Sequence, residues 1–460
     1  MGFDPVIASR RFGMGRSPAV KDPRSVAEMM AALTGPDLAA EAFPIPGQSQ
    51  MQPTVAELRE AATVRHDARG TAAEEAAAEA QRMLRDQARA GVIRNAMAVF
   101  ARAVTTGDGF RERLTAFWAD HFTVRARQGL TTHLVTPFIT DAIRPHLTGR
   151  FADMLTAVVL HPMMLVYLDQ ARSIGPNSRV GLRRDQGLNE NLARELLELH
   201  TVGVDGAYTQ TDVTQLAELL TGLSIDGEGE FRFRQDIVEP GAETVLGQSY
   251  GGKRRGQLDA IREALKDLAT HPDTARHIAH KLATHFVADT PPEALVDALS
   301  EVWRDSGGDL AAVTGALLNH PDAWQPEARK VLPPQQFIAS GLRALAVPPE
   351  SLFDLDRPDT GRVFLRSMQD MGQPWEQPPG PDGWPEEAVA WITPQGMASR
   401  ITWAMTAPGR VLPDLPDPRL FAEAALGPNL PEPVRFAASA AETRREGVGL
   451  VLASAAFQRR

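Results

Sequence analysis

The chain has 460 residues, of which 43% are hydrophobic and 23% are charged, and its formal net charge is -10. This composition is typical of a soluble globular protein, and no apolar run approaches the roughly 18 residues that a membrane-spanning helix needs. Nucleic-acid binding would need a concentrated basic face, which an acidic chain does not favour. Because cysteine is absent, the composition excludes disulfides, zinc–thiolate sites and thiol nucleophiles.

The first 20 residues include arginines but lack the apolar core of a signal peptide. The chain as written is therefore predicted to be cytoplasmic, unless an export segment has been removed. We expect neither a membrane span nor a nucleic-acid partner.

Helical periodicity predicts a mainly α fold, a large multi-helix globular protein with at most one or two small β-hairpins. Residues 71–104, rich in Ala, Glu, Gln, Arg and Leu, are predicted to form one long helix. Thr71 followed by Glu74 fits a capping box at its start. Buried helices are predicted at 110–124 and 152–169, where apolar residues recur every three or four positions.

Three His-Pro pairs stand just ahead of apolar-periodic runs: His161-Pro162, His271-Pro272 and His320-Pro321. Proline is favoured at the first helical position because the N–H that it lacks would have no partner there. The pairs are therefore interpreted as helix starts. A metal bound by the three histidines is the weaker alternative.

Two other segments depart from the helical pattern. One or two hairpins are predicted around 231–250, where aromatic and charged residues alternate between glycines. Residues 348–385 are crowded with proline and glycine and carry Trp375 and Trp384. An irregular surface segment is expected there, and a substrate groove lined by the two indoles is the alternative.

The length of the chain exceeds what one hydrophobic core usually covers. Residues 1–345 are expected to form a helical core that contains a helix-loop-helix at 189–222. Residues 346–460, the Pro/Trp-rich segment and C-terminal helices, are expected to pack on that core without folding independently.

Residues 189–212, NENLARELLELHTVGVDGAYTQTD, carry the densest set of reactive side chains. On a regular helix Asn191, Glu195 and Glu198 fall within roughly 60° of one another, at the edge of a leucine stripe. Burial of two carboxylates about 5–6 Å apart would make one of them hold a proton near neutral pH. Glu195, Glu198, Asn191 and His200 are therefore the candidate catalytic residues.

Two other interpretations of the carboxylates stay open. Helix-edge glutamates often pair with arginines, and the nearby candidates are Arg183, Arg184 and Arg194. A metal would need a ligand from another element, because a regular helix turns His200 roughly 140° away from Glu195. The candidate for that ligand is His121.

The loop from Thr201 to Asp212 has the length of a calcium-binding hand, with Asp205 and Asp212 as its only carboxylates. These two residues and His121 are the candidate metal ligands, and a divalent metal is the candidate cofactor. The favoured interpretation is structural: Thr209, three residues ahead of Asp212, caps the next helix.

Trp118, Asn189 and Trp375 are the candidate substrate-binding residues. His121 and His285 each lie on an apolar helical face, where a histidine is more often a hydrogen-bonded core residue than a ligand. No nucleotide-binding or serine-hydrolase motif occurs in a supporting context.

Motifs along almost the whole chain resemble those of a bacterial family known as domain of unknown function 1800. They are RFGMG at 11–15, FWADHF at 117–122, the 189–212 signature, TVLG at 244–247, HP at 271–272, IAHKL at 278–282 and LASAAFQ at 452–458. The resemblance implies export, since many relatives carry export signals, and a sulfatase-like partner protein. It implies no catalytic residues, and the N-terminus departs from the export pattern.

Two hypotheses follow. The first is a hydrolase that uses the paired carboxylates Glu195 and Glu198. The alternative is a non-catalytic interaction or scaffold protein, in which the segment from Trp375 to Trp391 docks a partner.

Overall fold

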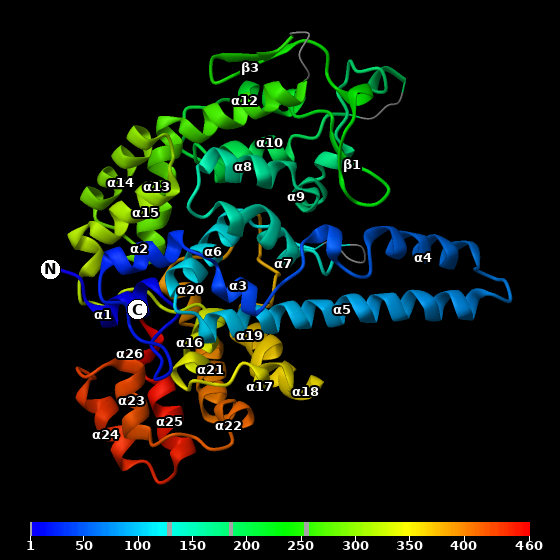
Figure 1. Ribbon diagram of the computed structural model, residues 1–460. Helices are drawn as coiled ribbons and strands as arrows, with labels where there is room; N and C mark the ends of the chain where they lie inside the picture. The colour runs from blue at the N-terminus through cyan, green and yellow to red at the C-terminus, as the bar shows by residue number, and fades with distance from the viewer. Residues whose placement is uncertain (1, 127–130, 184–186, 253–256) are drawn as a thin grey trace.

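The computed structural model describes residues 2–126, 131–183, 187–252 and 257–460. The fold is mainly α, as the periodicity predicts (Figure 1). In the first half of the chain the elements are α1 (Pro5–Ile7), α2 (Val26–Thr34), α3 (Leu38–Ala42), α4 (Val55–Asp67), α5 (Glu74–Thr105), α6 (Gly109–His121), α7 (Val135–Phe138), α8 (Phe151–Leu160), α9 (Pro162–Tyr167), α10 (Asn191–Glu195), α11 (Gln210–Leu219), β1 (Leu223–Ile225) and β2 (Phe231–Phe233). The second half contains β3 (Ala242–Val245), β4 (Gln248–Gly251), α12 (Gln257–Thr270), α13 (Pro272–Phe286), α14 (Glu293–Ser306), α15 (Leu310–Asn319), α16 (Pro334–Ala344), α17 (Glu350–Phe353), α18 (Arg357–Thr360), α19 (Arg366–Asp370), α20 (Ala388–Trp391), α21 (Pro394–Thr406), α22 (Pro408–Val411), α23 (Pro418–Leu426), α24 (Glu432–Ala440), α25 (Arg444–Ala453) and α26 (Ala455–Gln458).

The predicted long helix is α5, which extends well beyond the rest of the molecule together with α4 (Figure 1). The capping box predicted at its start is wrong. The Thr71 hydroxyl donates to the Ala68 carbonyl (2.7 Å), and the Glu74 carboxylate accepts from the Gly70 N–H (2.8 Å). Thr71 therefore belongs to the turn that precedes the helix.

The predicted buried helices form the centre of the main core. Helix α6 buries Leu114, Phe117, Trp118 and His121. The predicted helix at 152–169 is two helices, α8 and α9, because Pro162 starts a new one.

All three His-Pro pairs start helices, as predicted: α9, α13 and a 3-10 turn at Pro321–Trp324. In each pair Nδ1 of the histidine accepts a hydrogen bond from the backbone N–H two residues later, at 3.1–3.3 Å. The imidazole thus takes the place of the usual hydroxyl or carboxylate cap.

Both small sheets are antiparallel hairpins, one between β1 and β2 and the other between β3 and β4. The prediction of an irregular segment at 348–385 is wrong for residues 350–370. These residues form α17, α18, a π-helical turn at Gly361–Leu365 and α19. The prolines in this part precede a helix or stand in its first turn, where proline is tolerated.

Two hydrophobic clusters make up the interior. The first joins residues between Ala8 and Trp324. The second joins α16 and the C-terminal helices with the last third of α5, where the rings of Phe100 and Phe364 lie 4.6 Å apart. Within the described ranges, no helix has the length and apolar character needed to cross a membrane.

Candidate functional site

The signature helix is not a regular α-helix along its whole length. Helix α10 continues into a π-helical turn, η7 (Leu196–His200), so the angles of a regular helix do not apply beyond Glu195. Two histidines satisfy the carbonyls at the end of this turn. Nε2 of His277 donates to Leu199 O (3.1 Å), and Nε2 of His121 donates to His200 O (3.3 Å).

The two glutamates of the signature have different surroundings. Arg194 pairs with Glu198 at 3.3 Å and also with Glu190 at 3.2 Å. Glu195 forms no ion pair in the described part of the chain, and its pKa is raised by burial, by Glu198 and by Asp382. The predicted pairing with an arginine is therefore found for Glu198, through Arg194, and is not found for Glu195 in the described part of the chain. Arg184 lies outside the described residues.

The other two catalytic candidates on the signature, Asn191 and His200, differ from each other in their surroundings. The Asn191 side chain is exposed, and its backbone N–H donates to the side-chain oxygen of Asn189 at 2.9 Å. His200 is fully buried, and burial lowers its pKa to about 3, so its imidazole is neutral. Asn189 and Asn191 therefore shape the helix start.

The structure does not bring the candidate metal ligands together. Asp212 completes the predicted cap of α11, with its carboxylate 2.8 Å from the N–H of Thr209 and 2.7 Å from that residue's hydroxyl. Its other oxygen accepts from the Leu246 N–H (2.7 Å). Asp205 is exposed in the loop. The described residues contain no cluster of three or more histidine or acidic side chains that could hold a metal ion.

A groove of about 400 Å³ lies where the end of α6 meets α13 and residues 379–387. It is lined by Phe117, Asp120, His121, Lys281, Pro379, Asp382, Gly383, Trp384, Pro385, Glu386 and Glu387. We refer to it as the Asp120 groove. It brings together acidic and basic side chains from three separate parts of the sequence.

Asp120 is the residue of this groove best suited to proton transfer. Oδ1 of its carboxylate accepts from the backbone N–H of Trp384 at 2.8 Å. Burial raises its pKa to about 7; Glu386 and Asp382 add to the rise, and the Trp384 N–H and Lys281 oppose it. A carboxyl group that titrates near neutral pH can both donate and accept a proton.

Lys281 supplies the positive charge of the groove. Burial lowers its pKa, and the charges of Asp120, Glu386 and Asp382 oppose that shift. Asp382 also contributes to the raised pKa of Glu195, which places the signature carboxylate within electrostatic reach of the groove. The signature and the Asp120 groove are in contact, because His121, which lines the groove, donates to His200 O at the end of the signature helix.

Buried polar contacts hold residues 379–387, the segment that lines one side of the groove. Nδ1 of His285 lies 2.5 Å from Oε1 of Glu386, and Lys330 lies 3.2 Å from the other oxygen and 2.7 Å from Asp289. Burial would raise the pKa of Glu386, but His285 and Lys330 lower it to about 2. Glu386 is therefore a permanent anion that anchors the segment.

A second cavity, of about 190 Å³, shares Asp120, Trp384 and Glu386 with the groove. Trp375, Trp384 and Trp391 all line it, so we call it the indole cavity. Trp118, by contrast, is 1% exposed and packs within the aromatic core, away from both spaces. Of the predicted substrate-binding residues, Trp375 lines the indole cavity, whereas Trp118 and Asn189 line neither this cavity nor the Asp120 groove.

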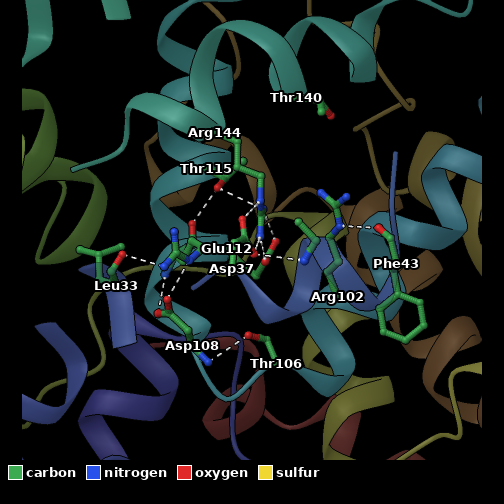
Figure 2. Close-up of polar contacts among 12 residues, drawn as sticks. Leu33, Asp37, Phe43, Arg102, Thr106, Asp108, Glu112, Thr115, Thr140 and Arg144 are labelled. Atoms are coloured by element: carbon green, nitrogen blue, oxygen red, sulfur yellow. Dashed lines mark hydrogen bonds and ion pairs between the residues drawn. The ribbon is translucent and has the colours of Figure 1, made fainter. Parts of the chain in front are cut away.

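A buried charge network forms another wall of the indole cavity. Figure 2 shows the guanidinium of Arg144 between the carboxylates of Asp37 and Glu112, each at 2.5 Å. Arg102 lies beside this network and donates through Nε to Phe43 O at 2.9 Å (Figure 2). The network ties α3, α5 and α6 to the 3-10 turn at Arg144–His146.

The sequence reasoning missed Asp120, Lys281, Glu386 and Glu376. Two of them did carry a signal, since Asp120 and Lys281 stand inside the motifs FWADHF and IAHKL, on helices that are largely buried. An ionisable residue at such a position is a candidate for a functional role. Glu376 and Glu386 lie in the irregular segment, where periodicity carries no information.

A family model described as "Protein of unknown function (DUF1800)" matches residues 7–459. The chain belongs to this family. The match covers the Asp120 groove, the indole cavity and the signature, and it confirms the resemblance carried by the motifs. No curated protein and no solved structure matches the chain. For this DUF1800 member, the chemistry of the site is therefore the basis for any functional proposal.

Proposed function

We propose that this DUF1800 protein is an enzyme that carries out general acid–base chemistry of the hydrolytic kind in the Asp120 groove. The observation that carries the proposal is the Asp120 carboxyl group. It lines a groove together with Lys281, it forms no ion pair in the described part of the chain, and burial raises its pKa to about 7. Perturbed carboxyls in a cleft are typical of acid–base catalysts.

Each group has a role in this proposal. Asp120 transfers the proton to or from the substrate. The Lys281 ammonium stabilises negative charge that develops on the substrate, and the partly desolvated surroundings strengthen that effect. The Trp384 N–H holds one oxygen of Asp120 and leaves the other for the reaction.

The paired-carboxylate hypothesis is modified accordingly. We propose Asp120 as the acid–base group of the groove, and Glu195, which does not line the groove, as a second carboxyl whose pKa the Asp382 charge also raises. Glu198 is a structural partner of Arg194 in this proposal. Pairs of carboxyls whose environments differ are a common way to divide acid and base roles.

The proposal can be tested before the substrate is identified. The parent chain and Asp120→Asn are incubated with a complex mixture of small metabolites, esters, amides and glycosides, and mass spectrometry follows the loss of each compound. Asparagine keeps the oxygen that accepts from the Trp384 N–H, so the fold is expected to persist. We expect compounds that the parent consumes and the variant does not.

A variant that consumes the same compounds at the same rate would place the chemistry elsewhere. No conversion by the parent, together with an Asp120→Asn variant that is less stable than the parent, would mean that Asp120 is structural. The non-catalytic interaction protein would then become the better proposal. The sulfatase-like partner and an exported location remain proposals from family resemblance, and a cytoplasmic location is the alternative.

A further inference from the structure

The indole cavity has the size and lining of a small-molecule site. An apolar cavity of roughly 150 Å³ holds a benzene-sized ring, and this one measures about 190 Å³. The rings of Trp384 and Trp391 lie 6.1 Å apart at 48°, and those of Phe100 and Trp375 lie 6.0 Å apart at 35°. These aromatic side chains present ring surface from α5, α20 and the irregular segment between α19 and α20.

Two carboxylates that line this cavity, Asp120 and Glu376, form no ion pair in the described part of the chain. Glu376 lines the cavity and accepts a hydrogen bond from the Thr136 hydroxyl, and it forms no ion pair in the described part of the chain. Its backbone φ is 53°, the left-handed region that residues other than glycine seldom adopt. Strained conformations of this kind cluster at ligand and active sites, where the surrounding structure maintains them.

Apart from Asp120 and Glu376, the charged groups that line the cavity have neighbours of opposite charge. Arg144 forms ion pairs with Asp37 and Glu112. The charges of the same two carboxylates also favour the charged form of Arg102. Two cations therefore face two anions at that wall.

On the opposite side, Glu386 is paired with His285 and Lys330. Asp120 forms no ion pair with any described residue, but the nearby charge of Lys281 acts on it. Glu376 has neither an ion pair nor a charged neighbour among the described residues, so it is the carboxylate of the cavity that a cationic ligand would neutralise.

We propose that the indole cavity binds a small organic cation, an ammonium group on an aromatic or aliphatic body, with the ammonium at Glu376 and the body against the indoles. Indole faces attract cations, and a partly buried carboxylate adds a charged hydrogen bond. The inference rests on the proposed function, which it deepens by naming the substrate class: the cavity shares Asp120 with the groove, so a ligand held there borders the reacting group.

The test compares two probes of nearly the same shape, benzylamine, which is a cation at pH 8, and neutral benzyl alcohol. Binding to the full chain is measured by calorimetry and by quenching of indole fluorescence. We expect benzylamine to bind at least tenfold more tightly than benzyl alcohol. Glu376→Gln should remove this preference, to within about twofold, while the affinity for benzyl alcohol is retained.

The matched control is Glu442→Gln, an exposed acid that lines neither the indole cavity nor the Asp120 groove, which should change neither affinity. Equal affinities of the parent for the two probes, or no binding of either, would overturn the proposal. A preference that persists in a folded Glu376→Gln would do the same. If that variant does not fold, the preference of the parent alone decides the matter.

The outcome is separable from that of the proposed function. The probe comparison measures equilibrium binding and involves no turnover. Equal probe affinities would remove the substrate class and leave acid–base chemistry at Asp120 standing. Unchanged turnover by Asp120→Asn would remove the catalytic role and leave the cation site standing.

Discussion

The backbone N–H of Trp384 donates to Oδ1 of Asp120 across 2.8 Å and so joins two residues 264 positions apart. This hydrogen bond holds residues 379–387, which form one side of the Asp120 groove, against the end of α6. It also orients the carboxylate, since one oxygen is fixed by the backbone. The same hydrogen bond lowers the pKa of Asp120, so that it rises less than burial alone would raise it.

Asp120→Asn is expected to stabilise the protein at neutral pH. The pKa of Asp120 in the folded chain is about 7, above the ~3.9 of an unfolded aspartate, so ionisation of this group disfavours the folded state as pH rises from about 4 to 7. At pH 8 the variant should be more stable by roughly 2 to 4 kcal/mol, and at pH 4 the difference should vanish. Urea unfolding at both pH values measures this. A lower stability of the variant at pH 8 would contradict the expectation.

The two signature glutamates should respond in opposite directions to substitution by glutamine. Burial raises the pKa of Glu195, so removal of its charge should increase the free energy of unfolding at pH 7 and have no effect below its unfolded pKa. Glu198→Gln breaks a partly exposed pair with Arg194 and should cost less than about 1 kcal/mol. Thermal unfolding of both single variants checks this, and a large loss for Glu195→Gln would show that this carboxylate is structural.

Arg144→Met should destabilise the protein by about 3 to 5 kcal/mol, because it leaves two carboxylates near an apolar cavity without their cation. The side chains of Arg144 and Glu112 are only 6% and 7% exposed. Arg24→Met is the control, because its pair with Glu28 is 87% and 43% exposed and should contribute little. Similar melting temperatures for the two variants would argue against a stabilising role for the buried network.

Residues 346–460 should not fold as an isolated fragment. Their hydrophobic cluster includes Phe100, Ala101 and Val104 from α5, and Phe364 packs directly on Phe100. Without α5 the fragment would expose this surface to water. Circular dichroism of the fragment should show no cooperative thermal transition, and a sharp one would establish an independent domain.

The sequence predicted local interactions well. The cap formed by Thr209 and Asp212 and the helix starts at the His-Pro pairs depend on residues within three positions of one another. Even there the pattern alone was insufficient. Thr54 and Glu57 form a capping box, whereas Thr71 and Glu74, with the same spacing, do not, because Thr71 lies in a turn.

The site itself could not be predicted because it depends on distant contacts. A regular helix was assumed for the signature, but the π-helical turn after Glu195 changes the direction of each later side chain. The end of that turn is held by His121 and His277, from α6 and α13. The partners of Asp120 likewise come from a segment without periodicity, so no pattern in the sequence linked them.

The most direct test of the central claim is the titration of the Asp120 carboxyl carbon by NMR, with Asp120→Asn used to assign its signal. The claim that Asp120 is the acid–base group of the groove predicts a midpoint near pH 7. A midpoint near 4, the value of an ordinary solvated aspartate, would contradict it.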